Sequence, residues 1–281
     1  MSRFTPTAPP PLHLPPPALL YNLPMLPRRS FLSLAAAAPA ALAATRIPTT
    51  IADAAQRMFP TPGKNPNGLQ ATPAGLWVYD QGNNHAALLN WADGKVLRDF
   101  NTETDKGSGI TFDGKDIWIA STYDSRIVRT DPTTGKALQS FPCPGSGVVH
   151  WGPRGPHPRP TGAHGLEFRN GELWIAVPPA MTIYVVNPAD GAVKRSFPAP
   201  GVRPHGIGWD PDGSLWCAES IYRSFFKMDP KSGAIKHQLM LPLREPRVDD
   251  LLIVPHGMTV QDRHIWFSVA ETAEVYRLPL P

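Results

Sequence analysis

The strongest constraint on the fold is a pattern that occurs five times along the chain, a glycine followed after nine or ten residues by a tryptophan. The pairs are Gly68 with Trp77, Gly109 with Trp118, Gly165 with Trp174, Gly206 with Trp216, and Gly257 with Trp266. Consecutive glycines of the pattern lie 41, 56, 41 and 51 residues apart. Periods of this length are typical of folds in which one small unit is repeated and each copy packs on its neighbours.

Each repeat holds a second regular feature, a turn rich in Asp, Asn, Pro and Gly between two β-forming segments. The turns at 131–135 and 187–191 read DPTTG and NPADG, and the segments 183–186 and 192–197 flank the latter. Such residues favour tight hairpins between antiparallel strands. Each unit is therefore predicted to be four short strands, which is one blade of a propeller. The sequence predicts an all-β chain whose residues 45–281 form a five-bladed β-propeller.

The fifth unit ends at Pro281 after only three predicted strands, so a fourth strand must come from elsewhere. Residues 56–63 resemble 194–201, which contain the fourth strand of the third unit. We expect this early segment to complete the last blade and close the ring, which leaves no open sheet edge. A ring of six or more blades remains the alternative and would need the proline-rich insertion 146–162 to form a degenerate blade. The five repeated tryptophans are expected in the core between blades.

Residues 1–44 are predicted to lie outside the propeller, as a proline-rich extension and an export signal. Arg28 and Arg29 precede an apolar run that ends in small residues around Ala43, which is typical of twin-arginine export. The run is too short and too rich in alanine for a stable membrane span. The protein is thus expected in the periplasm or secreted. An ordinary secretory signal or an uncleaved anchor is the alternative, and the start is either Met1 or Met25.

The net charge restricts the classes of binding partner, and the cysteine content bears on whether a disulfide forms. The formal net charge is +4, and residues 1–44 carry three arginines and no acid, so the rest of the chain is nearly neutral. We therefore expect no nucleic acid as partner. We also expect no membrane span after signal removal. The expected partner is a small-molecule or peptide substrate, and the protein is expected to be a monomer. The sequence leaves open whether Cys143 and Cys217 pair, although an exported protein meets an oxidising compartment.

Three of the nine histidines occupy one register of the repeat, directly before the glycine: His164, His205 and His256. Asn67 and Ser108 hold this position in the first two repeats. Because the innermost strand of each blade lines the channel, these positions are expected to form a ring around the axis. Three imidazoles with an open fourth position are typical of catalytic zinc, so we predict a divalent metal, zinc, on the three histidines. The alternative is that they bond channel water or each other.

A second ring is expected three residues after each tryptophan, and its charged members are Asp80 and Glu219. Glu219 belongs to the same blade as His205 and is a candidate metal ligand, partner of a histidine, or general base. An ion pair with Arg203 or Arg223 is the alternative. Tyr123, at the end of a predicted strand near the same face, is a candidate proton donor.

The segments around these residues resemble known families. Residues 203–207 (RPHGI) and 212–219 (DGSLWCAE) are similar to the repeat of virginiamycin B lyase-type propellers, which implies a histidine and a glutamate acting with a divalent metal to open a cyclic ester. His205 and Glu219 match that pair best, and His256 with Glu271 less well. The three histidines also resemble the zinc ligands of the peptide-amidating lyase propeller. By this combined argument the candidate catalytic residues are Glu219, His205 and Tyr123. The residues expected to bind substrate are Asn67, Ser108, Asp80, Arg203 and Glu271.

The resemblance has departures. Those lyases have more blades, whereas five blades are similar to plant-type glutaminyl cyclase, which 164–168 (HGLEF) and 108–112 (SGITF) also resemble. Ser108, however, stands where that family carries a glutamate.

Four functions follow as hypotheses. The first is a metal-dependent lyase or hydrolase for a small ester-, lactone- or peptide-like substrate. The others are a non-catalytic propeller that binds a peptide, glycan or protein, a glutaminyl cyclase-like enzyme, and a copper or redox protein using Cys217 and Met258. The chain has neither a phosphate-cradling glycine loop nor a Gly-x-Ser-x-Gly nucleophile motif.

Overall fold

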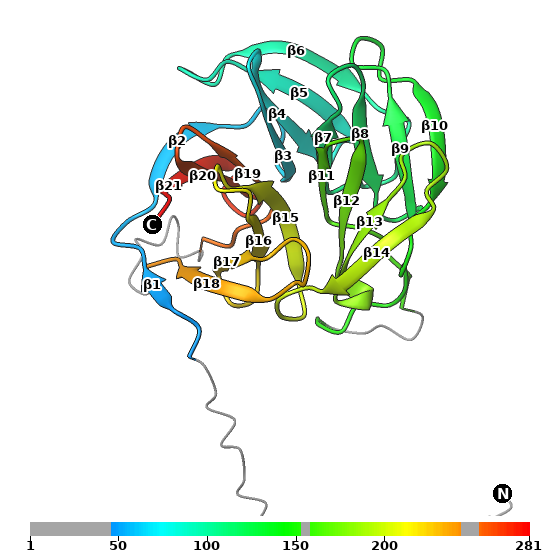
Figure 1. Ribbon diagram of the computed structural model, residues 1–281. Helices are drawn as coiled ribbons and strands as arrows, with labels where there is room; N and C mark the ends of the chain where they lie inside the picture. The colour runs from blue at the N-terminus through cyan, green and yellow to red at the C-terminus, as the bar shows by residue number, and fades with distance from the viewer. Residues whose placement is uncertain (1–45, 153–157, 243–252) are drawn as a thin grey trace, which may run out of the picture. The chain divides into compact units, whose positions relative to one another are not determined.

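Five antiparallel sheets, each built on four strands, surround a common axis in the computed structural model (Figure 1). The structure describes residues 46–152, 158–242 and 253–281. The five-bladed β-propeller predicted from the sequence is confirmed. The described parts of the insertion 146–162 contribute a single bridge, between Gly147 and Thr161, and no sixth blade. The predicted export signal within residues 1–44 lies outside the described residues.

The blades follow one another along the chain, and each runs from the axis outward. Blade 1 contains β3 (Pro66–Thr72), β4 (Gly75–Asp80), β5 (His85–Leu89) and β6 (Val96–Asn101). Blade 2 contains β7 (Ile110–Phe112), β8 (Ile117–Ser121), β9 (Arg126–Thr130) and β10 (Ala137–Pro142). Blade 3 contains β11 (Gly165–Arg169), β12 (Glu172–Val177), the short 3-10 helix η1 (Pro178–Ala180), β13 (Thr182–Val186) and β14 (Val193–Pro198). Blade 4 contains β15 (Pro204–Trp209), β16 (Leu215–Glu219), β17 (Ser224–Met228) and β18 (Ile235–Met240).

Blade 5 joins the two ends of the described chain. Its strands are β19 (Met258–Gln261), β20 (His264–Val269), β21 (Glu274–Pro279) and, from the N-terminal side, β2 (Gln56–Pro60). The antiparallel pairing of Gln56 with Arg277 confirms the predicted closure of the ring. One strand was not predicted: β1 (Thr49–Ile51) adds to the outer edge of blade 4, parallel to β18. No helix in the described ranges has the length and hydropathy of a membrane span.

The repeated tryptophans hold neighbouring blades together, as expected. All five are buried, with exposed fractions of 4% or less. Trp216 of blade 4, for example, packs with Phe267 and Leu278 of blade 5, and Trp266 of blade 5 packs with Leu76 and Val78 of blade 1. An indole in the second strand of each blade thus fills the interface with the next blade, which explains why the residue recurs at a fixed distance from the axial glycine.

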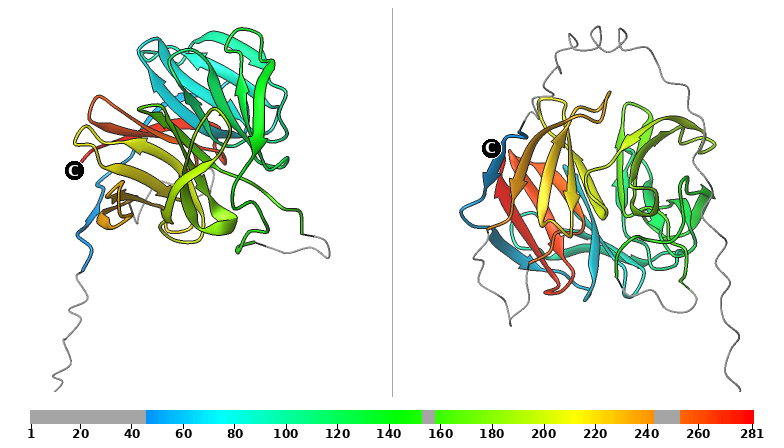
Figure 2. Two further views of the ribbon diagram at one scale, coloured as in Figure 1. Left: turned by 45° about the vertical axis from the view of Figure 1, so that its right-hand side comes forward. Right: turned by 90° about the horizontal axis from the view of Figure 1, so that it is seen from below.

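The repeated glycines bring the five innermost strands β3, β7, β11, β15 and β19 together at the axis, which Figure 1 shows at the centre and Figure 2 from two other sides. A Cβ on Gly165 would collide with the carbonyl oxygen of His205, and one on Gly206 with the backbone of Met258. The same relation continues around the ring to Gly257, Gly68 and Gly109. The cavity volume enclosed at this level is about 0 Å³. The glycines therefore close the channel, and the histidines before them form its floor on one side.

Candidate functional site

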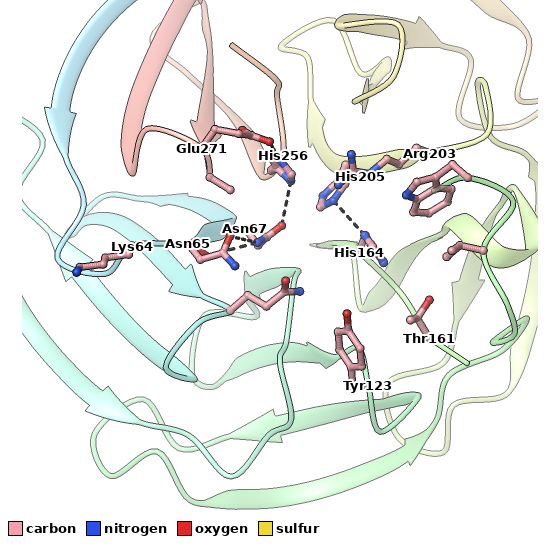
Figure 3. Close-up of a pocket in the computed structure, with 14 residues that line it drawn as sticks. Lys64, Asn65, Asn67, Tyr123, Thr161, His164, Arg203, His205, His256 and Glu271 are labelled. Carbon is pink, nitrogen blue, oxygen red and sulfur yellow. Dashed lines mark hydrogen bonds and ion pairs between the residues drawn. The ribbon is translucent and has the colours of Figure 1, made fainter. Parts of the chain in front are cut away.

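The three histidines converge on a cavity at one mouth of the channel. It has a volume of about 540 Å³. His205 lies in β15, while His164 and His256 end the loops that lead into β11 and β19. Figure 3 shows His164, His205, His256 and Asn67 close together around the cavity. The lining residues are Lys64, Asn65, Asn67, Gln81, Tyr123, Val149, Trp151, Thr161, His164, Arg203, His205, His256, Ala270 and Glu271.

His164 and His205 form a neutral pair. Nδ1 of His164 lies 3.0 Å from Nε2 of His205, and the two rings meet edge to face with centroids 4.6 Å apart. Burial, the nearby guanidinium of Arg203 and the charge of His256 lower the pKa of His164 to about 3. Burial, followed by the repulsion that a protonated His205 would meet from His164, His256 and Arg203, holds the pKa of His205 well below its usual value. One neutral ring donates to the other, so the pair presents one nitrogen lone pair and one N–H that its members do not use.

Those two remaining nitrogens are Nε2 of His164 and Nδ1 of His205. Both are buried, and neither has a hydrogen-bond partner among the described residues. A buried polar atom without a partner is costly, and in native proteins it commonly marks the place of a water, an ion or a ligand. The pair therefore keeps one hydrogen-bond donor and one acceptor unused.

His256 differs from the other two because both of its nitrogens are bonded. Nδ1 lies 3.1 Å from Oδ1 of Asn67, and Nε2 lies 3.2 Å from Oε1 of Glu271 (Figure 3). The amide nitrogen of Asn67 donates to Oδ1 of Asn65 at 3.1 Å, which turns the amide oxygen of Asn67 toward the imidazole. The ring of His256 also meets that of His205 edge to face, with centroids 4.8 Å apart. The imidazole is thus fixed on three sides.

Glu271 reaches the cavity from the turn between β20 and β21. Burial opposes its ionisation, but the hydrogen bond from His256, the charge of that ring and the nearby Arg203 outweigh this effect, so the pKa of the carboxyl lies below its usual value. A charged carboxylate hydrogen-bonded to an oriented imidazole is the arrangement that moves protons in many enzymes.

The opposite wall of the cavity carries Arg203, Trp151 and Tyr123. The guanidinium carbon of Arg203 lies 5.5 Å from the ring centroid of Trp151, whose ring meets His164 edge to face at 6.0 Å. Tyr123 projects from the turn between β8 and β9, and the guanidinium of Arg159 covers its ring at 4.8 Å. This wall therefore offers a cation, a large apolar surface and a phenol.

Glu219 takes another place than the one expected. It is fully buried and does not line the cavity. Its Oε1 accepts the backbone N–H groups of Val202 at 3.2 Å and Arg203 at 2.7 Å, and its Oε2 accepts that of Tyr222 at 2.6 Å. Both oxygens bind the loops at the end of the blade, so its position corrects the expectation of a base in the channel. Among the described ion pairs Glu219 has none, whether with Arg203 or Arg223.

Asp80 and Ser108 also lie elsewhere than their expected role in substrate binding requires. Asp80 stands in blade 1 where Glu219 stands in blade 4, and its carboxylate accepts the backbone N–H groups of Asn65 at 2.6 Å and Gly82 at 2.8 Å. Ser108 is fully buried, and its hydroxyl lies 3.4 Å from Oδ1 of Asn67. Neither lines the cavity, so neither is placed to bind a substrate there. Asn67, Arg203 and Glu271 do line it.

The sequence argument missed Trp151, Lys64 and Gln81. Trp151 and its neighbour Val149 belong to the insertion 146–162, whose length between repeats was the available signal. Lys64 and Gln81 come from loops that flank the inner strands of blade 1, outside the register that was compared. The second long insertion has its residues 243–252 outside the described residues.

The donor set does not fit a three-histidine metal site as it is placed. In the described parts of the chain, no group of three or more His, Cys, Asp or Glu side chains is placed to hold a metal ion. Both nitrogens of His256 are engaged, and one nitrogen of His164 faces one of His205. The zinc site expected from the sequence therefore stays a prediction. Cys143 and Cys217 are both buried and free, so no disulfide links them.

Comparison with known proteins shows the fold but no family. No protein-family model and no curated protein matches the sequence. A glutaminyl cyclase from Myxococcus xanthus is similar in structure, with a TM-score of 0.62 at 10% identity over 82% of this chain and 97% of that chain.

Two lyase structures are similar as well. The virginiamycin B lyase of Staphylococcus aureus has a TM-score of 0.46 at 21% identity over 79% of this chain and 69% of that one. A streptogramin B lyase has a TM-score of 0.47 at 16% identity over 81% and 97% of the two chains. The resemblance to virginiamycin B lyase-type propellers read from the sequence thus reappears among similar structures. At these identities the likeness concerns the fold.

Proposed function

We propose that the protein is a lyase or hydrolase that acts on a small ester-, lactone- or peptide-like substrate in the cavity at the channel mouth. The observation that carries the proposal is the pair of His256 and Glu271, 3.2 Å apart in the wall of a cavity of about 540 Å³. The pair joins a charged carboxylate to an imidazole that Asn67 and His205 hold in one orientation. Proton transfer by such a positioned pair contributes typically 10²- to 10⁴-fold to a rate.

The remaining lining residues have roles that fit this chemistry. A substrate above the floor of the cavity lies against the rings of His164 and His205, while Arg203 and Lys64 offer donors for its carbonyl or hydroxyl group. In an elimination, the carboxylate of Glu271, which His256 orients, takes a proton from the carbon beside the breaking C–O bond. The leaving oxygen then receives a proton from the phenol of Tyr123. In a hydrolysis, the same carboxylate takes the proton from the attacking water.

A zinc-dependent version of this function is a second candidate. It is favoured by the two buried nitrogens without partners, Nε2 of His164 and Nδ1 of His205. Zinc on these histidines would polarise a carbonyl or activate water. Elemental analysis of the purified protein tests it. About one equivalent of zinc, lost in His205→Ala, supports this version, whereas a fully active protein without metal removes it.

Activity assays on a substrate panel test the proposal. The panel contains cyclic depsipeptides, simple lactones, hydroxyglycine peptides and peptides with an N-terminal glutamine, the last because of the structural likeness to a glutaminyl cyclase. His256→Ala and Glu271→Gln are expected to lower kcat at least about 100-fold. His264→Ala is the matched control, because this histidine lies in β20 away from the cavity and bonds only the backbone oxygen of Asp262.

Two results would contradict the proposal. Full activity in His256→Ala would remove the proton-transfer role of the pair. Failure to convert any member of the panel, with a bound peptide or glycan recovered from the cavity, would instead support a propeller that binds without catalysis.

A further inference from the structure

The guanidinium of Arg203 lacks a partner for its charge. The side chain is half-buried in the cavity wall, and its Nε is buried without a hydrogen-bond acceptor. Within residues 46–152, 158–242 and 253–281 its guanidinium makes no ion pair, whereas Arg57, Arg129 and Arg195 of the blades each bind a carboxylate. Burial lowers the pKa of Arg203, while the charges of Glu271 and Glu219 raise it. A partly buried cation without a bonded anion has lost part of its hydration, and an anion that bonds it would offset that loss.

The two nearest carboxylates are already committed. Glu271 is bonded to His256. Glu219 accepts three backbone N–H groups, including that of Arg203 itself. Both lower the electrostatic cost of the guanidinium from a distance, but neither bonds it. An anion that enters the cavity can therefore supply the acceptor that these two groups do not provide.

Among the described lining residues, two cations, Lys64 and Arg203, stand against one acid, Glu271. The indole of Trp151 lies against the guanidinium, with its ring centroid 5.5 Å from the guanidinium carbon. A planar guanidinium beside an aromatic ring still presents the N–H groups on its edge, which match the two oxygens of a carboxylate.

We propose that the substrate is a monoanion whose carboxylate binds Arg203, with the adjacent acyl chain packed on Trp151. This inference rests on the proposed function, because it names the substrate class of the same cavity. A dianionic phosphate fits less well, since the carboxylate of Glu271, which lines the same cavity, would repel two charges more strongly than one. The carboxylate on Arg203 fixes one end of the substrate, so that its reacting bond lies over the histidine floor.

Calorimetric binding of two matched probes tests this proposal. N-acetylglycine carries the carboxylate, and N-acetylglycinamide has the same size without the charge. The acid is expected to bind at least about 10-fold more tightly than the amide, because a hydrogen bond to a charged group carries roughly that much discrimination or more. Arg203→Met should abolish the preference, and Arg203→Lys, which keeps the charge but not the planar fork, should retain part of it.

Arg169→Met is the matched control. Arg169 also lies over a tryptophan, with its guanidinium carbon 4.3 Å from the ring centroid of Trp209, but it is outside the cavity. This variant is expected to keep the full preference for the acid. Glu271→Gln removes the one lining acid and should raise the affinity for N-acetylglycine while it lowers turnover.

The outcomes separate this inference from the proposed function. Equal binding of acid and amide, no measurable binding of the acid, an undiminished preference in a folded Arg203→Met protein, or tighter binding of inorganic phosphate would each overturn the carboxylate assignment. Turnover of neutral substrates that is unchanged in Arg203→Met would do the same and leave the proposed function standing. Conversely, a preference that depends on Arg203 in a protein that converts no substrate would keep the carboxylate site and remove the catalytic role.

Discussion

Replacing Glu167 by glutamine should make the protein much less sensitive to alkaline pH. Glu167 lies in β11, two residues after the axial Gly165, and only 5% of its surface is exposed. Burial raises its pKa from 4.5 to about 8, because the backbone N–H of Phe168 and the amide of Gln70 compensate the charge only in part. At neutral pH the carboxyl is therefore protonated in the folded protein and ionised in the unfolded chain.

The size and the sign of the effect follow from this difference. Below pH 4.5 the carboxyl is protonated in both the folded and the unfolded state, so it does not lower the stability. Between pH 4.5 and about 8 the folded state holds one more proton, so its stability falls as the pH rises, and above about 8 the loss is complete. At about 1.36 kcal/mol per pH unit, the loss is at most about 5 kcal/mol. For a domain of this size that corresponds to roughly 10–20 °C in Tm.

Thermal unfolding, followed by tryptophan fluorescence at about pH 5 and about pH 9, measures this loss of stability. The Tm of the wild type should fall more between these two conditions than the Tm of Glu167→Gln, and the difference between the two proteins isolates this carboxyl from all other titrating groups. Glu172→Gln is the control, because Glu172 pairs with Arg195 at the surface and its pKa is lowered. Parallel Tm profiles for wild type and Glu167→Gln would refute the assignment of a buried neutral acid.

Three further predictions concern other parts of the chain. Glu219→Ala leaves three backbone N–H groups without an acceptor and should lower the free energy of unfolding by about 3 kcal/mol or more in urea titrations; an unchanged midpoint would contradict its loop-binding role. Trp151→Ala should weaken binding of N-acetylglycine several-fold without changing Tm, which calorimetry and melting check together. Arg28→Lys with Arg29→Lys should keep the protein in the cytoplasm, as cell fractionation would show; unchanged export would remove the twin-arginine prediction.

The fold was predictable because every blade contains the same glycine and tryptophan at a nearly constant spacing. The glycine must be free of a Cβ at the axis and the tryptophan must fill the next interface, so both recur at a fixed spacing. The same logic brought His164, His205 and His256 together, since one register of the inner strand meets itself around the axis. The strand β1 escaped prediction because three residues on a sheet edge carry no periodic signal.

The chemistry of the site was harder to predict because it depends on where oxygen atoms point. Glu219 follows its tryptophan at the same distance as Asp80, and both look like channel acids in the sequence. In the structure both serve the backbone of the turns that end their blades. Glu271 is the acid that reaches the cavity, since it lies two residues beyond a strand end, in a hairpin turn. Trp151 depends on the path of an insertion that tertiary packing alone determines.

The repeated glycines at the axis close the inner end of the cavity. A ligand that enters at the histidine mouth cannot leave at the other side, because the backbones of neighbouring inner strands are in contact there. Reactants and products must then pass through the same opening, so a product that dissociates slowly blocks the next turnover. A polymer cannot be threaded through such a site, and only a chain end, a short side branch or a small free molecule can reach the floor.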